Sequence, residues 1–203
     1  MKLIRVPQDR VGAMIGKKGE VRKAIEEKAG IVLQIDSETG EIIIDDTKAK
    51  DPVLVMKVED VIKAIGRGFS PEKAYKLMEE EMYLHIIDIH DYVGKSPKHL
   101  RRIKARIIGK NGKTRRIIEG MTGAFLSIYG GTVSILGDFN AVEVSKTAVD
   151  MILNGSEHST VYKYLERKRR EAKLATLDSI VSAGAGEEEG DDLPPFGDDD
   201  SEE

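Results

Sequence analysis

The sequence has 203 residues, of which 40% are hydrophobic and 33% are charged, and it contains no cysteine. This composition is typical of a globular protein with one large or two small domains, and it excludes a disulfide framework, thiol catalysis and a zinc ribbon. No stretch approaches the ~18 consecutive apolar residues of a membrane span, and the first residues do not form a signal peptide. We therefore expect a cytoplasmic protein without a membrane partner.

The charge is segregated along the chain. Overall, 32 Lys and Arg oppose 36 Asp and Glu, but eleven of the acidic residues lie from Asp178 to Glu203, where no Lys or Arg occurs. Residues 1–177 therefore hold 32 basic against 25 acidic side chains. A basic body favours a polyanionic partner, with surface solubility as the alternative explanation. The Gly-, Glu- and Asp-rich segment at 183–203 predicts a disordered acidic tail.

Residues 1–66 predict a domain in which a strand, two helices, two strands and a helix follow one another. The expected elements are a strand at 2–6, a helix capped by Asp9 that ends at Gly16, a helix from Gly19 to Gly30, strands at 31–36 and 41–45, and a helix at 52–66. A tight elbow, Gly16-Lys17-Lys18-Gly19, separates the two helices that come first.

The same order of elements recurs in residues 83–155. The expected elements are a strand at 83–89, a loop at 91–95, a helix capped by Ser96, a helix from Gly112 to Gly120 or Gly123, strands at 124–129 and 132–136, and a helix capped by Asn140. The elbow is now Gly109-Lys110-Asn111-Gly112, and Gly109 follows Gly16 by 93 residues. The sequence thus predicts two domains of one topology, a helical connector at 67–82 and a C-terminal helix at 156–182.

The elbow has the properties of a phosphate-binding site. The start of a helix carries unpaired backbone N–H groups and a partial positive charge, and both attract phosphate. Glycine at both ends of the two-residue bridge lets a sugar-phosphate backbone approach without meeting a Cβ atom. We expect a groove for splayed bases beside the elbows, lined by Val11, Ile15, Ile107 and Ile108.

The two copies differ in charge. Ten Lys or Arg and no acidic residue lie between Lys95 and Ile118, whereas Arg10 to Lys28 contains six basic residues and three Glu. The second copy is therefore predicted to be the stronger RNA site. The candidate phosphate contacts are Arg101, Arg102, Lys104, Lys113, Arg115 and Arg116. The first copy either adds affinity through linkage or is a protein-contact surface.

Both copies resemble type I KH domains, whose fold is β-α-α-β-β-α with a G-x-x-G loop between the first two helices. In the second copy, the matching residues are Ile107 to Gly112, Ile118 and Thr122 to Ala124; in the first, they are Met14 to Gly19, Ile25 and Ala29 to Gly30. The resemblance implies an α+β fold. Both copies depart from it at the third residue after the loop, where Arg22 and Arg115 replace the usual isoleucine. Each arginine is expected either to contact a phosphate or base edge, or to form a structural ion pair.

The tandem copies, the connector motif from Gly66 to Ala74 and the helix from Arg115 to Glu119 are similar to a narrower group. This group is the archaeal form of the small-subunit assembly factor called partner of the Nob nuclease. The resemblance implies binding of single-stranded rRNA near the 3′ end, assistance to a PIN-domain nuclease in rRNA processing, and contact with the α subunit of translation initiation factor two. Two alternatives stay open, namely a protein adaptor with incidental RNA binding and an mRNA-binding KH regulator.

The residues do not predict an enzyme. Gly112-Lys113-Thr114 ends like a P-loop, but the glycine required five residues earlier is Ile107. The four histidines are scattered without ligand-spaced partners, and the acidic residues cluster in the tail, which cannot hold them in a fixed geometry. We expect no catalytic site, no metal, no cofactor and a monomeric protein.

Overall fold

The computed structural model describes residues 2–49, 51–94 and 96–184, with side chains described as far as residue 178. The predicted disordered tail at 183–203 therefore lies almost wholly outside the described residues. No helix within the described ranges is both long and apolar enough to cross a membrane. Residues up to Glu166 form one compact unit, and the described residues from Arg167 to Gly184 belong to a second unit.

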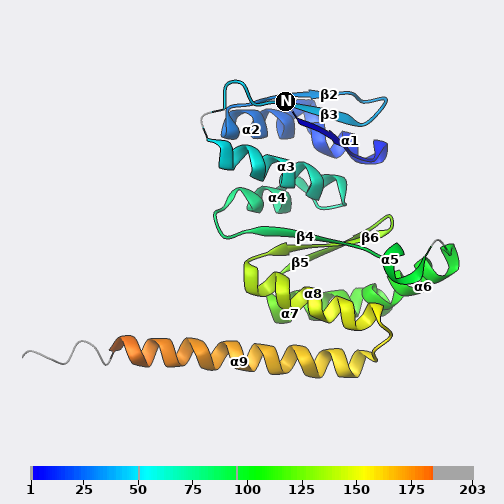
Figure 1. Cartoon of the computed structure of the whole chain (residues 1–203), viewed down its shortest axis with the longest axis vertical. Coiled ribbons are helices and arrows are strands. Elements are labelled where there is room, and N and C mark those ends of the chain that lie inside the picture. Colours follow the sequence, from blue (N-terminus) through cyan, green and yellow to red (C-terminus); the bar gives the residue numbers. More distant parts are fainter. Residues whose placement is uncertain (1, 50, 95, 185–203) are drawn as a thin grey trace, which may run out of the picture. The chain divides into compact units, whose positions relative to one another are not determined.

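The first domain has the predicted order of elements (Figure 1). Its elements are β1 (Lys2–Arg5), α1 (Gln8–Ile15), the 3-10 turn η1 (Lys17–Gly19), α2 (Glu20–Ala29), β2 (Val32–Ile35), β3 (Glu41–Asp45) and α3 (Pro52–Gly66). The strands form an antiparallel sheet in the order β1-β3-β2, so the last strand in sequence is central. Ile42 and Ile44 of β3 are fully buried because alternate residues of a strand face the same side.

The second domain repeats this order. Its elements are β4 (Tyr83–Asp88), α5 (His90–Val93), α6 (Pro97–Ile108), the 3-10 turn η3 (Lys110–Gly112), α7 (Lys113–Thr122), β5 (Phe125–Tyr129), β6 (Thr132–Gly137) and α8 (Phe139–Leu153). Its antiparallel sheet has the order β4-β6-β5, which matches the first sheet strand for strand. The predicted α+β class and the repeated topology are confirmed.

Two local predictions for the second domain are wrong. The segment expected to be a loop contains the short helix His90–Val93. The N–H of Gly94, which follows this helix, donates a hydrogen bond of 2.8 Å to the His90 carbonyl. Asn140 does not cap α8. Asp138 does, because its carboxylate accepts a hydrogen bond of 2.8 Å from the Ala141 N–H.

The connector packs as part of the first domain. It consists of the short helix α4 (Pro71–Ala74) and the 3-10 turn η2 (Tyr75–Met78). Leu77 is buried in the core cluster of the first domain, and the Tyr75 hydroxyl donates a hydrogen bond of 2.9 Å to the Val21 carbonyl in α2. Burial raises the pKa of Tyr75. These contacts fix the connector against the helix that follows the first elbow.

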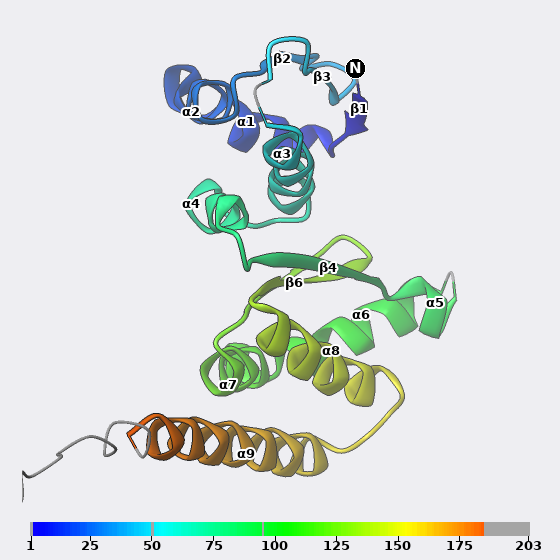
Figure 2. The ribbon, with the colours of Figure 1, turned by 60° about the vertical axis from the view of Figure 1, so that its left-hand side comes forward.

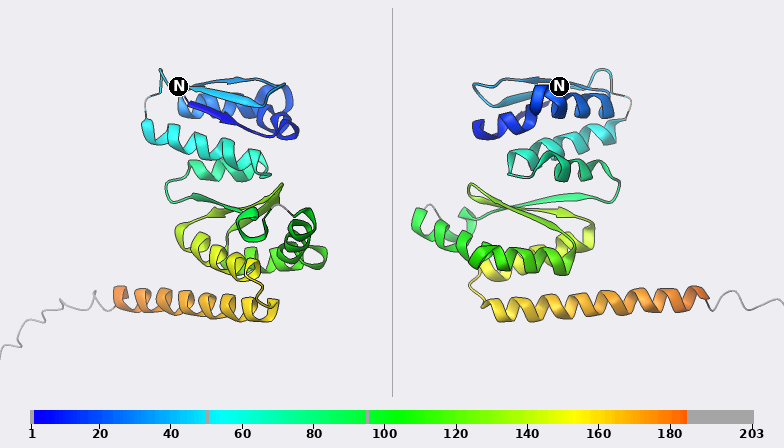
Figure 3. Two further views of the ribbon diagram at one scale, coloured as in Figure 1. Left: turned by 45° about the vertical axis from the view of Figure 1, so that its right-hand side comes forward. Right: turned by 180° about the vertical axis from the view of Figure 1, so that it is seen from behind.

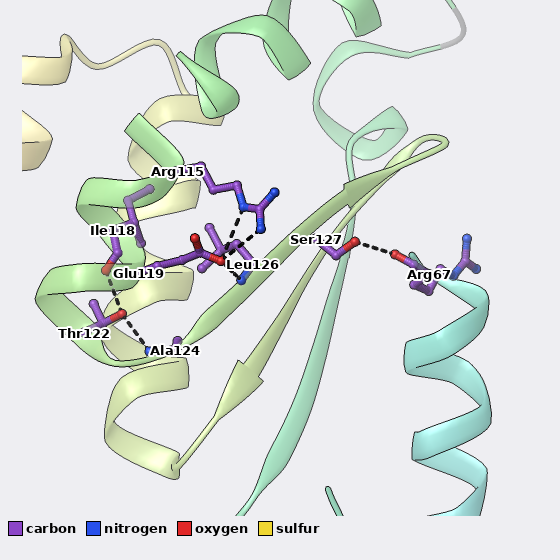
Figure 4. A network of polar contacts seen from close by, with 8 residues as sticks. All are labelled: Arg67, Arg115, Ile118, Glu119, Thr122, Ala124, Leu126 and Ser127. Carbon is purple, nitrogen blue, oxygen red and sulfur yellow. Dashed lines mark hydrogen bonds and ion pairs between the residues drawn. The ribbon is translucent and has the colours of Figure 1, made fainter. Parts of the chain in front are cut away.

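The second sheet is covered on both faces (Figures 2 and 3). Its inner face packs on α6, α7 and α8, while Leu84, Phe125 and Leu136 on its outer face join the core cluster of the first domain. The Ser127 hydroxyl also donates a hydrogen bond of 2.8 Å to the Arg67 carbonyl (Figure 4). The helices that carry the second elbow therefore lie on the side of their sheet that faces away from the first domain.

The C-terminal helix α9 (His158–Gly184) begins against the second domain. Val161 and Leu165 are buried in the core cluster of that domain. The Tyr162 hydroxyl lies 3.1 Å from the hydroxyl of Thr114, which is the second residue of α7 and follows the second elbow by two residues. The first turns of α9 thus support the helix that starts at this elbow.

Candidate nucleic-acid interface

The two elbows follow the same backbone path. In the second domain, Gly109 has φ 73° and ψ 173°, Asn111 has φ 52° and Gly112 has φ 75°. In the first domain, the residue equivalent to Asn111 is Lys18, with φ 55°. Asparagine adopts this left-handed conformation more readily than lysine, so the second elbow is the less strained of the two.

The two glycines of each elbow are needed for different reasons. A Cβ atom on Gly109 would lie 2.3 Å from the Thr114 Oγ1 atom, and one on Gly16 would lie 2.4 Å from the Val21 Cγ2 atom. The first glycine therefore lets the next helix pack against the loop. A Cβ atom on Gly112 would meet nothing within 4 Å. Only this second glycine, with Gly19 in the first domain, leaves open space where a backbone phosphate can approach.

The helices that follow the two elbows start with opposite charges. Helix α7 begins at the exposed Lys113 and has no acidic residue in its first turn, whereas α2 begins at the exposed Glu20. These two residues occupy the same position in the repeat, 93 residues apart. A carboxylate at the positive end of a helix stabilises that helix and repels a phosphate. The second elbow is therefore the better anion site, because its helix start attracts negative charge and Lys113 adds to the attraction.

Four of the six candidate basic residues around the second elbow form two pairs. Arg101 and Arg102 are exposed on α6. The Lys104 ammonium donates a hydrogen bond of 2.8 Å to the Gly130 carbonyl, and the Arg116 guanidinium donates one of 2.9 Å to the Asn111 carbonyl. Arg116 thereby braces the elbow from the helix that follows it. Arg101 and Arg102 are therefore available to a ligand, whereas hydrogen bonds hold the charges of Lys104 and Arg116 in fixed positions.

The apolar residues beside the elbows are only partly available. Ile107 is fully buried and Val11 is 3% exposed, so both belong to the cores of their domains and not to a surface that bases contact. The expectation that Ile107 and Val11 line the groove is corrected accordingly. Ile15 and Ile108, one residue before each elbow, are half-buried and are the apolar side chains that remain partly accessible there.

The two arginines that replace isoleucine form ion pairs with a glutamate four residues later. Figure 4 shows the pair of the second domain. Arg22 contacts Glu26 over 3.0 Å, and Arg115 contacts Glu119 over 3.3 Å. Of the two roles predicted for these arginines, the structure shows the structural ion pair in both copies. Sequence reasoning did not select Glu119 as a site residue, although a Glu four residues after an Arg on a helix indicates such a pair.

The fold and its two G-x-x-G elbows define a protein with two type I KH domains. A family model of the eukaryotic-type KH domain (KH domain type I) matches residues 83–170, and a KH domain model matches residues 2–67. The KH domain-containing protein MJ0443 of Methanocaldococcus jannaschii is 47% identical over 178 residues, which are 88% of this chain and 78% of the relative.

Two solved structures are also similar. The crystal structure of APE0754 from Aeropyrum pernix has a TM-score of 0.84 and 39% identity, covering 90% of this chain and 97% of that chain. Dim2p from Pyrococcus horikoshii, solved in a complex with a/eIF2α and rRNA, has a TM-score of 0.78 and 44% identity, covering 84% of this chain and 94% of that chain. The chain belongs to the archaeal Dim2 family of tandem KH-domain proteins.

Proposed function

We propose that this protein acts without catalysis in small-subunit ribosome biogenesis by binding single-stranded rRNA near its 3′ end. The binding site is the second KH domain, with the elbow Gly109 to Gly112 holding about four nucleotides of backbone. The observation that carries this assignment is the start of α7, where an open glycine is followed by an exposed lysine and no acidic residue in the first turn. The complex of the Pyrococcus relative with rRNA supports it.

Three features of the second domain supply the contacts in this proposal. Lys110, Asn111 and Lys113 meet phosphate at the elbow, the exposed Arg101 and Arg102 extend the positive surface along α6, and Ile108 offers apolar contact. Lys104, Arg115 and Arg116 contribute positive charge from fixed positions. Positive charge in this arrangement attracts the RNA backbone without selecting a sequence.

The first KH domain has a weaker RNA site in this proposal. Its elbow, with Lys17, Lys18 and the later Arg22, keeps the backbone path of the second, but Glu20 places a negative charge at the helix start. The same charge favours a protein contact for this domain. The complex of the Pyrococcus relative with a/eIF2α supports that initiation-factor subunit as the partner. A PIN-domain nuclease that trims the rRNA 3′ end is the second partner we propose.

Binding of RNA in two forms tests the proposed function. We expect the full chain to bind a short single-stranded RNA with the sequence of the small-subunit rRNA 3′ end, and to lose most affinity when the RNA is annealed to its complement. The elbow needs an exposed backbone with unstacked bases, and a duplex does not present them. Fluorescence anisotropy measures both affinities. Equal affinity for the two forms would contradict a KH-type site.

The adaptor hypothesis predicts a different pattern. A pull-down of a/eIF2α that survives ribonuclease and high salt, together with RNA affinity no tighter than micromolar, would assign the main role to protein contacts. Loss of the captured subunit after ribonuclease treatment would show that RNA bridges the two proteins.

A further inference from the structure

Both KH domains contain the same three-part contact between a helix and an edge strand. In the second domain, the Glu119 Oε1 atom accepts hydrogen bonds from the Arg115 guanidinium, at 3.3 and 3.4 Å, and from the Leu126 N–H, at 2.9 Å (Figure 4). In the first domain, the Glu26 Oε1 atom accepts from the Arg22 Nε atom at 3.0 Å and from the Leu33 N–H at 2.8 Å. The contact therefore belongs to the repeat and holds each arginine in place.

The contact lies close to the second elbow. Arg115 is three residues after Gly112 on α7, a rise of about 4.5 Å along the helix axis. Leu126 belongs to β5, which is an edge strand of the sheet. The side chains of Arg115 and Glu119 keep 39% and 19% of their surface exposed. Glu119 lies seven residues after Gly112, a rise of about 10.5 Å. The pair is therefore placed for a base that extends from a phosphate at the elbow along α7.

The pair presents one hydrogen-bond donor beside one acceptor. Within the described part of the chain, every hydrogen bond to the Glu119 carboxylate goes to its Oε1 atom. The Oε2 atom keeps its capacity to accept. The Arg115 guanidinium uses its Nε and Nη2 atoms for Glu119, which leaves the two N–H groups of Nη1 as donors.

We propose that Arg115 and Glu119 together read the edge of one base, with Glu119 Oε2 accepting from an exocyclic amino group and Arg115 donating to the adjacent ring nitrogen. This inference rests on the proposed function. It assigns to Glu119 a specificity role beside its contact with β5.

The chemistry of the pair favours adenine or cytosine at this position. Both bases carry an amino group next to a ring nitrogen acceptor, and a carboxylate accepts well from such an amino group. The N3–H group of uracil is flanked by two carbonyl oxygens, which repel a carboxylate. Guanine presents two adjacent N–H groups that suit a carboxylate with both oxygens available, but Oε1 of Glu119 already accepts three hydrogen bonds.

Glu119→Gln tests the proposal, because the amide still accepts from the Leu126 N–H through its oxygen but presents an NH₂ group where Oε2 was. The probe is a single-stranded RNA with the rRNA 3′-end sequence. Each adenosine in turn is replaced by purine riboside, and each cytidine by 2-pyrimidinone riboside, so that only the amino group is removed. We expect Glu119→Gln to weaken binding of the unmodified RNA about tenfold, and to have almost no effect on an RNA that lacks one particular amino group.

Glu26→Gln is the matched control, because Glu26 makes the same contacts in the first domain. It is expected to leave the affinity for every RNA in the series within about twofold. An equal loss for all RNAs with Glu119→Gln would show a purely structural role, and no loss would show that Glu119 does not face RNA; either result overturns the inference while the proposed function stands. Failure of the unmodified chain to bind any of these RNAs would overturn both.

Discussion

Replacing Lys110 and Asn111 together by Asp is expected to reduce the affinity for single-stranded RNA by about 100-fold or more at ~0.1 M salt. The change brings two carboxylates to the point where we propose that a phosphate meets the start of α7. Aspartate is compatible with the left-handed backbone of position 111, where φ is 52°. The fold should therefore survive, and circular dichroism together with the thermal unfolding midpoint verifies that it does.

The first elbow provides the control for this experiment. Changing Lys17 and Lys18 to Asp removes more positive charge from the chain than the first variant does, yet we expect only a few-fold loss of RNA affinity. Glu20 already makes this helix start unfavourable for a phosphate. Anisotropy titrations at several salt concentrations separate the two variants. A larger loss from the first-elbow variant would place the main RNA site in the first domain and contradict our account.

Exchanging the charges at the two helix starts should exchange part of the RNA affinity. Lys113→Glu is expected to weaken RNA binding about 30-fold and to reduce the slope of log K against log salt by about one, the value of one lost phosphate contact. Glu20→Lys should strengthen binding several-fold, because it gives α2 the lysine that α7 already has. Both side chains are exposed, so neither change disturbs a core.

The double variant separates local charge from net charge. Glu20→Lys combined with Lys113→Glu has the net charge of the unmodified protein, so long-range attraction of RNA stays nearly constant. We expect this chain to bind RNA more weakly than the unmodified chain, because the first elbow has the more strained lysine at position 18 and fewer basic neighbours. Unchanged affinity would indicate that only the total charge matters, and it would contradict the proposed difference between the two elbows.

The fold could be predicted from the sequence because the glycine spacing and the apolar periodicity both repeat in the two halves of the chain. Gly16 and Gly109 fix the elbows, and alternating residues such as Ile42 and Ile44 fix the strands and their buried face. The residues that cap the helices were harder to predict. Asn140 was expected to cap α8, but Asp138, two residues earlier, has the extended backbone conformation of the cap, and Asn140 lies inside the helix.

The backbone path of the candidate site was predictable from the sequence, but its side-chain contacts were not. Charge counts alone predicted that the second copy is the stronger RNA site. The structure adds that Lys113 is exposed at the start of α7, where the first copy has the exposed Glu20. Periodicity does not distinguish a groove from a core, so Ile107 was placed in the groove although it is fully buried. The hydrogen bond from the Leu126 N–H to Glu119 joins residues of different elements, and no local pattern reveals it.

Ultraviolet crosslinking of the full chain to RNA in cells, with both the RNA and the crosslinked peptides sequenced, tests the central claim most directly. We predict crosslinks to the 3′ end of small-subunit rRNA that map to peptides covering Arg101 to Arg116 in the second KH domain. Crosslinks spread over messenger RNA, or confined to peptides around Gly16 to Arg22, would contradict the account.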